Sequence, residues 1–312
     1  MAKYRQNLPQ LSGNMFLSDG GMETTLIFLE GIELPEFASF VLMANAEGRK
    51  HLKNYYLSYL NIARKNGTGF ILDTPTWRAN PDWGAKLGYG LADLDAINRR
   101  SVDLLAELRG EYETAATPCV ISGAIGPRED GYKAGNMDAD EAESYHTAQI
   151  ETFADTEADM VAAYTLTNYN EAIGIARAAH ASKIPCVISF TVETDGRLVT
   201  GMSLGEAIER VDEATSGAPQ YYMINCAHPT HFAEVLDQGG AWTGRIGGLR
   251  ANASTKSHAE LDDSTTLDAG DPLDLGGRYR ALTHSFPRMR VLGGCCGTDH
   301  RHVAAICEAC AA

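Results

Sequence analysis

The chain has 312 residues, and its 41 acidic against 26 basic side chains give a net charge of −15. That charge argues against nucleic acid, whose phosphates need a basic face, and against an anionic membrane surface. The composition, 44% hydrophobic and 21% charged, is ordinary for a globular protein. Because no stretch reads as a membrane span or a signal peptide, we expect a cytoplasmic protein without a membrane partner.

Eight short apolar runs recur along the chain, each followed by a turn and a helical stretch. They are rich in β-branched residues and do not alternate with polar ones, which is typical of parallel strands buried on both faces. Helices are predicted at 138–156, 170–182 and 202–215, the last beginning with a capping box of Ser203 and Glu206. The predicted strands are 15–21, 69–76, 118–126, 159–167, 185–193, 221–229, 244–252 and 290–297.

Eight strand–helix units in about 300 residues predict an α/β fold, a single-domain (β/α)8 TIM barrel over residues 1–312, with a doubly wound open sheet as the alternative. A barrel carries its active site at the carboxyl ends of the strands. The long connection 251–289 is expected to form a lid or an oligomer contact. Polar residues gather at the predicted strand ends: Asp19, Thr74, Thr76, Tyr164, Thr165, Glu193, Cys226, Asn252, Cys295 and Cys296.

Three cysteines end two of these strands: Cys226 in YYMINCAHPT, and the adjacent Cys295 and Cys296 in VLGGCCGTDH. Their sulfurs should converge over the barrel mouth, where three thiolates suit tetrahedral Zn²⁺ and leave one position open. Such a centre is a poor Lewis acid but can hold a fourth thiol as a nucleophilic thiolate. Gly293 and Gly294 remove bulk beside the pair. The alternatives are small buried hydrophobes, or a vicinal disulfide between Cys295 and Cys296.

The other four cysteines give weaker indications of a catalytic or metal-binding role. Cys119 and Cys186 lie at strand starts, far from the expected mouth, and are predicted to be core residues. Cys307 and Cys310 are spaced as C-x-x-C in the last helix, but without a second pair this spacing favours a helix face over a metal site.

The chain resembles the zinc-dependent homocysteine S-methyltransferase family over nearly its whole length. The similar stretches are SDGGMETTL, SFTVETDGRLVTGMSLGEAIE, INCAHP and GGCCGTDHRH. The resemblance implies a (β/α)8 barrel and Zn²⁺ as the cofactor, with Cys226, Cys295 and Cys296 as the catalytic metal ligands. It also implies methyl transfer to the thiol of an amino acid.

The resemblance further implies an amino-acid site, in which Asp19 pairs with an ammonium and the amides of Gly20 and Gly21 approach a carboxylate. Members of the family usually carry a glutamate at the end of the fourth strand, where it helps to bind the amino group of homocysteine. Here the stretch YTLTNYNEA puts Tyr164 in that place. Either Glu193, at the end of the fifth strand, supplies the missing charge, or the acceptor is a thiol other than homocysteine.

A second departure lies after the second strand, where TPTWRANPDW replaces a family stretch such as TNTYQAS. Methyl donors for this chemistry are cations, and the aromatic faces of Trp77, Trp83 and Tyr89 could bind one. The alternative is a rigid loop of packed aromatic side chains. Arg78 would repel a cationic centre, so a role in binding would require it to pair with a carboxylate of the donor.

These features predict a zinc-dependent S-methyltransferase that moves a methyl group from a sulfonium or quaternary ammonium donor to homocysteine or a related thiol, forming methionine or an analogue. One alternative is a demethylase of a methylated metabolite that uses another thiol as the acceptor. A non-catalytic zinc-binding barrel is the other. The predicted partners are a small thiol acceptor and a cationic methyl donor, and a homo-oligomer is left open.

Overall fold

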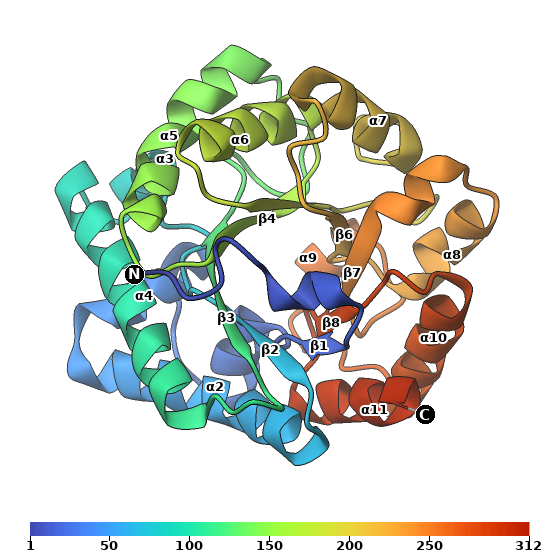
Figure 1. Ribbon diagram of the computed structural model, residues 1–312, viewed down its shortest axis with the longest axis horizontal. Coiled ribbons are helices and arrows are strands. Elements are labelled where there is room, and N and C mark those ends of the chain that lie inside the picture. Colours follow the sequence, from blue (N-terminus) through green and yellow to red (C-terminus); the bar gives the residue numbers. More distant parts are fainter. Residues whose placement is uncertain (312) are drawn as a thin grey trace.

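The computed structural model describes residues 1–311, which form a closed barrel of eight parallel strands ringed by helices (Figure 1). Each strand pairs with the next along the chain, and β1 closes the ring by pairing Phe16 with Val291 of β8. The (β/α)8 prediction is confirmed, and the open sheet is not formed. The strands are β1 Phe16–Leu17, β2 Gly69–Asp73, β3 Cys119–Ile125, β4 Met160–Leu166, β5 Cys186–Phe190, β6 Tyr222–Asn225, β7 Ile246–Ala251 and β8 Val291–Gly294.

The helices cover the outside of the barrel, and three of them match the predicted helical stretches. The side chain of Ser203 accepts a hydrogen bond from the backbone N–H of Glu206 and so caps α7. This is one half of the predicted capping box, because the Glu206 carboxylate accepts from Arg210 instead. The helices are α1 Met22–Thr24, α2 Ala46–Asn66, α3 Pro81–Lys86, α4 Leu91–Tyr112, α5 Ala139–Ala154, α6 Tyr169–Ala181, α7 Leu204–Thr215, α8 Pro229–Asp237, α9 His258–Asp262, α10 Pro272–Ser285 and α11 His300–Ala311. Shorter helical turns are Pro9–Ser12, Thr25–Leu29, Pro35–Phe37, Ser39–Ala44 and Ala241–Arg245.

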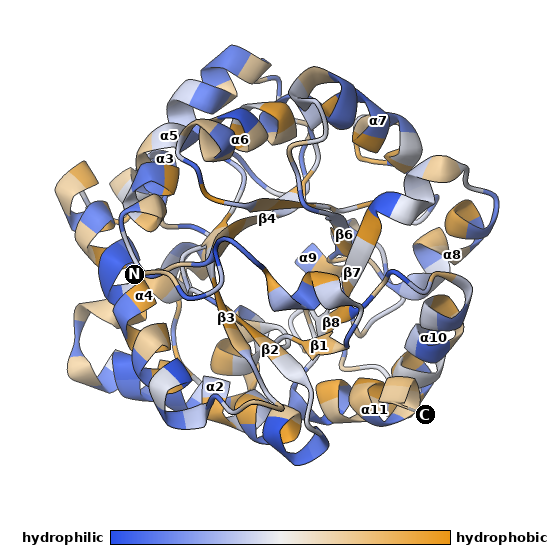
Figure 2. Cartoon of the chain, viewed as in Figure 1, coloured by the Kyte–Doolittle hydropathy of each residue, from blue (hydrophilic) through white to orange (hydrophobic). Residues whose placement is uncertain are grey.

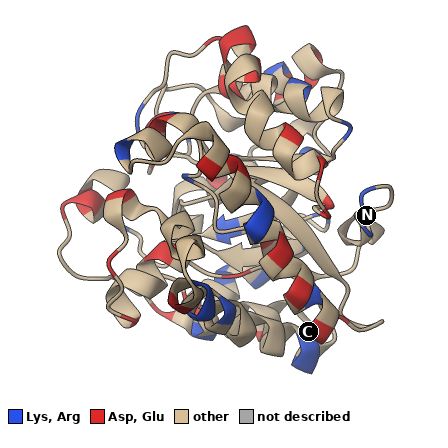
Figure 3. Cartoon of the chain, turned by 90° about the vertical axis from the view of Figure 1, so that its left-hand side faces the viewer, with Lys and Arg blue, Asp and Glu red and all other residues tan. Residues whose placement is uncertain are grey.

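Two hydrophobic clusters hold the barrel together. The larger one lies between the strands and the helices, and the smaller one fills the barrel interior with inward-facing side chains such as Ile71, Val120 and Met160. Figure 2 shows the strands as the most hydrophobic part of the chain, and Figure 3 shows acidic and basic residues carried largely by the surrounding helices. No helix among residues 1–311 is long and apolar enough to span a membrane.

The first residues of the chain cover the amino end of the barrel (Figure 1). Leu8 packs into the interior cluster, and the Gln10 side chain donates to the sulfur of Met160 at 3.2 Å. The backbone N–H of Tyr4 donates to the Asp159 carboxylate, just before β4, at 2.6 Å. Because this end is covered by the chain itself, the functional end of the barrel is the opposite one, where the strands finish.

The four cysteines that were assigned no chemistry lie where the sequence places them. Cys119 and Cys186 are buried in the core at the starts of β3 and β5. Cys307 is buried on the inner face of α11, and the sulfur of Cys310 accepts a hydrogen bond from the Thr283 hydroxyl of α10 at 3.8 Å. These contacts confirm the core and helix-face interpretations.

Candidate functional site

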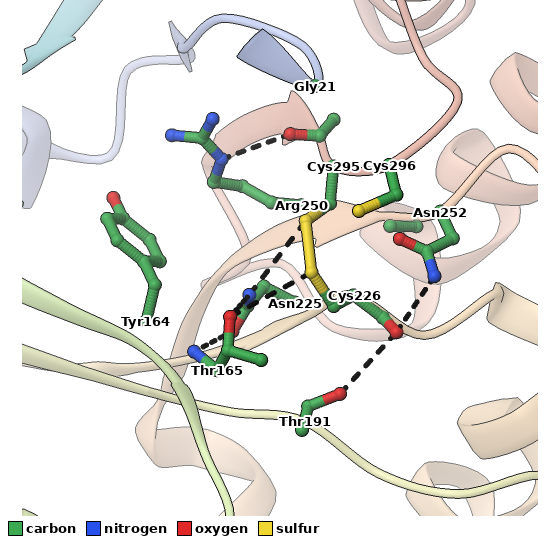
Figure 4. The surroundings of a disulfide bond; sticks show 12 residues. Gly21, Tyr164, Thr165, Thr191, Asn225, Cys226, Arg250, Asn252, Cys295 and Cys296 are labelled. Atoms are coloured by element: carbon green, nitrogen blue, oxygen red, sulfur yellow. Dashed lines mark hydrogen bonds between the residues drawn. A yellow bond between two sulfur atoms is a disulfide. The ribbon is translucent and has the colours of Figure 1, made fainter. Parts of the chain in front are cut away.

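Three cysteine sulfurs meet at the mouth of the barrel (Figure 4). Cys226 follows β6, Cys295 and Cys296 follow β8, and all three sulfurs lie within 4.8 Å of one another. Cys226 and Cys295 form a disulfide with their Cα atoms 5.4 Å apart, so the vicinal pairing of Cys295 with Cys296 is not what the structure shows. Tetrahedral Zn–thiolate bonds of about 2.3 Å set sulfurs about 3.8 Å apart, so the reduced trio fits Zn²⁺.

The backbone of Cys226 is held in an unusual conformation, with φ at 54° in the left-handed region. Its carbonyl oxygen accepts from Asn252 Nδ2 at 2.9 Å and contacts His258 Nε2 at 2.6 Å and Thr191 Oγ1 at 3.4 Å. Strain of this kind persists only where surrounding contacts over-determine it. The neighbouring strand ends therefore fix where the Cys226 sulfur points.

The glycines before the cysteine pair are required by packing. A Cβ on Gly293 would meet Ser18 Oγ at 1.9 Å, and one on Gly294 would meet Thr298 Oγ1 at 2.0 Å. Gly297, just after the pair, has φ at 79°, which favours glycine. These contacts agree with the expectation that Gly293 and Gly294 remove bulk beside the cysteine pair.

A chamber of about 90 Å³ lies beside the sulfurs, and we call it the inner chamber. At its base the guanidinium of Arg250 bridges two carboxylates: Nη2 donates to Asp19 Oδ1 at 2.5 Å and Nη1 to Asp73 Oδ2 at 2.6 Å. Its lining residues are Asp19, Gly20, Gly21, Met22, Glu23, Thr24, Phe37, Asp73, Thr74, Pro75, Trp77, Ala124, Tyr132, Tyr164, Thr165, Asn225, Cys226, Arg250, Cys295 and Cys296.

Burial shapes the ionisation of this cluster. Desolvation raises the pKa of Asp19 above its usual value and that of Asp73 to about 6, although Arg250 opposes both shifts. Burial also raises the phenol pKa values of Tyr55 and Tyr164 far above 10, so both hydroxyls stay protonated. They act as donors, Tyr55 to Asp19 Oδ2 at 3.0 Å and Tyr164 to Asp73 Oδ2 at 2.8 Å.

The predicted acceptor residues are only partly brought together. Asp19, Gly20, Gly21 and Tyr164 line the inner chamber, but the amide of Gly21 donates within the protein, to the carbonyl of Thr298 at 3.0 Å. Their roles toward an amino acid stay predictions.

Glu193 lies outside both chambers at the barrel mouth. It does not line the inner one, because its carboxylate is turned toward His258, where Oε1 lies 3.0 Å from Nδ1. Its expected part in binding an ammonium is untested and stays a prediction.

A larger space of about 370 Å³, the outer chamber, adjoins the inner one. Residues 254–268 of the long connection form one of its walls, while a role for that segment as a lid or in oligomers stays a prediction. The two chambers share Thr24, Phe37, Trp77, Tyr132 and Cys296. The other lining residues of the outer chamber are Phe28, Arg78, Asp130, Ser254, His258, Leu261, Asp262, Ser264, Thr266, Leu267, Asp268 and Gly297.

The three aromatic residues after β2 do not form one cage. Trp77 lines both chambers, whereas Trp83 is buried under the guanidinium of Arg78, 3.6 Å from its ring centre. Tyr89 packs edge-on against Phe40 at 5.2 Å. The packed-loop interpretation therefore describes Trp83 and Tyr89. Trp77 lines both chambers, and the Arg78 guanidinium lies 4.8 Å from the centre of its ring.

Arg78 lines the outer chamber and makes no ion pair with residues 1–311, although Asp130 and Glu23 lie near enough to oppose the lowering of its pKa. Its Nε and Nη1 atoms are buried and have no hydrogen-bond partner among residues 1–311. Burial lowers the pKa of the Arg78 guanidinium, which nevertheless remains charged at neutral pH. A half-buried guanidinium with two buried, unpaired nitrogen donors is suited to a carboxylate ligand.

Sequence reasoning missed four residues of the site. Asp73 and Arg250 each carry a charge inside or at the end of an otherwise apolar strand, and that mismatch is a signal that could have identified them. Tyr132, whose hydroxyl lies 3.9 Å from the Cys296 sulfur, and His258 lie outside the strands in stretches with no periodic pattern. No sequence signal of that kind marks them.

Comparisons with known proteins agree with this architecture. The family model described as homocysteine S-methyltransferase matches residues 16–310. Homocysteine S-methyltransferase 1 of Arabidopsis thaliana is 22% identical, with 96% of this chain and 95% of the relative covered. Homocysteine S-methyltransferase of Escherichia coli K12 is 24% identical, with 94% of each chain covered.

Solved structures show the same fold. The Escherichia coli homocysteine methyltransferase MmuM in its metallated form has a TM-score of 0.71 at 21% identity, covering 95% of this chain and 96% of that one. Its oxidized form has a TM-score of 0.72 at 22% identity, covering 97% and 99%. At this level of identity the likeness establishes the barrel.

Proposed function

The chain belongs to the homocysteine S-methyltransferase family, and on that premise we propose that it transfers a methyl group from a cationic donor to homocysteine or a closely related thiol, with Zn²⁺ as cofactor. The ion would be held by Cys226, Cys295 and Cys296. Bound there, it would lower the pKa of the acceptor thiol and keep that sulfur nucleophilic near pH 7. The observation that carries the proposal is the convergence of three sulfurs within 4.8 Å beside a chamber with charged walls.

The three cysteine ligands favour a metal that is bound through thiolates. The three sulfurs come from two strand ends and leave one side open to the inner chamber, which suits a site with three protein ligands and one exchangeable position. The relative whose structure has been solved in a metallated form is consistent with a metal at this mouth. Because only thiolates ligate the ion, the proposal requires a reducing compartment such as the cytoplasm.

The two chambers suit two substrates that meet at Cys296. The acceptor occupies the inner chamber, where Asp19, Asp73 and Arg250 present charge, and the donor occupies the outer one. Holding the acceptor sulfur in line with the donor methyl makes the transfer effectively unimolecular. The donor departs as a neutral thioether or amine, so no side chain has to protonate it.

The outer chamber suits a methyl donor that carries both a positive and a negative charge. The faces of Phe37, Trp77 and Tyr132 can receive a sulfonium or quaternary ammonium centre, and acidic side chains including Asp130 line the same space. The unpaired guanidinium of Arg78 can take a carboxylate of the donor. The same geometry serves biosynthesis of methionine or demethylation of the donor, and the products formed from a panel of donors distinguish the two.

Metal content and activity test the proposal together. Purified under reductant, the protein should hold about one Zn²⁺ per chain and methylate homocysteine from a sulfonium or quaternary ammonium donor. Cys226→Ala, Cys295→Ala and Cys296→Ala should each lose the metal and the activity, measured by elemental analysis and product assay. Cys310→Ala, near the end of α11, is the control and should keep both the metal and the activity. Full activity in a metal-free sample would refute the role of zinc.

A further inference from the structure

The inner chamber contains more negative than positive charge at its base. Asp19 and Asp73 face a single guanidinium, that of Arg250, and all three side chains are buried. Two carboxylates against one cation leave one negative charge unbalanced when both acids are ionised. A buried charge of this kind is costly unless a ligand of opposite sign pairs with it. The imbalance indicates that the natural ligand brings a cation to this point.

The two carboxylates differ in the hydrogen bonds that they already accept. Both oxygens of Asp19 are engaged, Oδ1 by Arg250 and Oδ2 by Tyr55. In Asp73, by contrast, Arg250 and Tyr164 both donate to Oδ2, and Oδ1 is buried without a partner among residues 1–311. The free acceptor atom of the pair therefore belongs to Asp73.

Other groups near Asp73 leave that oxygen available. The hydroxyl of Ser122, paired in register with Asp73 on β3, lowers the pKa of the Asp73 carboxylate and also lacks a partner. A hydroxyl is neutral, so it cannot balance the charge even when it donates. Glu23, the other acid of the chamber, accepts from Ser39 through Oε1 at 2.8 Å and is less buried than Asp73. Glu193 is absent from the lining and faces His258.

Resting on the proposed function, we propose that Asp73 is the residue that binds the ammonium of the thiol acceptor. In this arrangement Asp73 Oδ1 receives the ammonium, while Arg250 and Tyr164 hold Oδ2 and so fix the plane of the carboxylate. Asp19 contributes charge through Arg250 and does not contact the ammonium. The carboxylate of Asp73, at the end of β2, therefore selects a thiol that carries an α-amino group. Neither Tyr164 nor Glu193 binds the ammonium in this arrangement.

The test compares two acceptors that differ only in the amino group, homocysteine and 4-mercaptobutanoate. The parent should prefer homocysteine in kcat/KM by about 10- to 150-fold, the range expected for one charge-assisted hydrogen bond. Asp73→Asn should reduce that preference to near unity, because its amide oxygen can still accept from Arg250 and Tyr164 but carries no charge. Calorimetric titration of each thiol into the zinc-loaded protein provides a readout that does not depend on turnover.

Matched variants separate Asp73 from its neighbours. Asp19→Asn and Glu193→Gln should each keep a clear preference for homocysteine, and a variant of either that abolishes it would overturn the assignment. Thermal unfolding of Asp73→Asn beside the parent establishes that the variant is folded. A second variant then returns the charge from a neighbouring side chain: Asp73→Asn with Tyr164→Glu puts a carboxylate on the residue that otherwise donates to Asp73. Recovery of the preference in that double variant supports the proposal.

Failure of the proposed function gives a different result. If the parent neither binds nor methylates any thiol, the methyltransferase proposal itself fails. If the parent methylates thiols but treats homocysteine and 4-mercaptobutanoate alike, or if Asp73→Asn keeps the preference, only the role of Asp73 is overturned.

Discussion

Among residues 1–311, Arg250 is the only cation that contacts both Asp19 and Asp73, and replacing it with glutamine removes that contact. The guanidinium makes hydrogen bonds of 2.5 to 3.2 Å to the two carboxylates and to the carbonyls of Gly20 and Gly294. Breaking a buried ion pair by removing one partner costs about 3–5 kcal/mol, because the remaining charge is left uncompensated. For a chain of this length that corresponds to a fall in Tm of about 6–10 °C, at roughly 2 °C per kcal/mol.

Urea unfolding of Arg250→Gln and the parent, in reductant and at one pH, measures this loss directly. The matched control is Arg278→Gln, which removes a slightly longer ion pair, 2.7 Å to Asp274, on the exposed face of α10. A pair in that setting is worth about 0–1 kcal/mol. If Arg250→Gln is no more destabilising than this control, the buried cluster does not depend on its guanidinium, and the charge imbalance inferred for the inner chamber is wrong.

Three further predictions follow from the site. Arg78→Gln should raise the KM of donors that carry a carboxylate by about 10-fold or more and leave the acceptor KM unchanged, as measured by initial rates; equal effects on a donor without a carboxylate would contradict the assignment. Gly293→Ala should destabilise by about 1–3 kcal/mol because its Cβ would meet Ser18 Oγ at 1.9 Å, whereas Gly277→Ala, with open space around it in α10, should stabilise by about 0.5–1 kcal/mol in the same urea assay. Burial raises the pKa of Asp73 to about 6, so the contribution of that carboxyl to the free energy of unfolding is fully present below about pH 4 and is lost as the pH rises through 6. Asp73→Asn should flatten this part of the plot of stability against pH. An unchanged plot would show that Asp73 is not the titrating group.

The fold could be predicted because its signals are local. Each strand is a short apolar run. The helix that follows it can be recognised from neighbouring residues, either by its capping residue, as with Ser203 before α7, or by its hydrophobic periodicity. Cys226, Cys295 and Cys296 could be placed together for the same reason, since in a closed parallel barrel every strand ends at one mouth. The prediction required only the order of the strands around the barrel, which is the same as their order in the sequence.

The polar base of the inner chamber could not be predicted in the same way. Asp73 and Arg250 lie 177 residues apart, and their contact depends on the tilt of the strands and on which side chains face inward at that level. The position of Tyr164 depends on an irregularity between Ala163 and Leu166 in β4, where Thr165 has φ at 62°. A β-branched residue gives no hint of such a conformation, so the sequence does not reveal that Tyr164 reaches Asp73.

The covered amino end of the barrel has a practical consequence for handling the protein. The first residues pack by the starts of the strands, and α11 follows β8 and, like the other helices of a (β/α)8 barrel, leads back from the mouth, so both ends of the described chain lie away from the cysteines. A support or fusion partner attached at either point leaves both chambers facing the solution. Trimming Tyr4, Leu8 and Gln10 would instead uncover the interior cluster. Immobilised assays should therefore attach the intact chain by its ends.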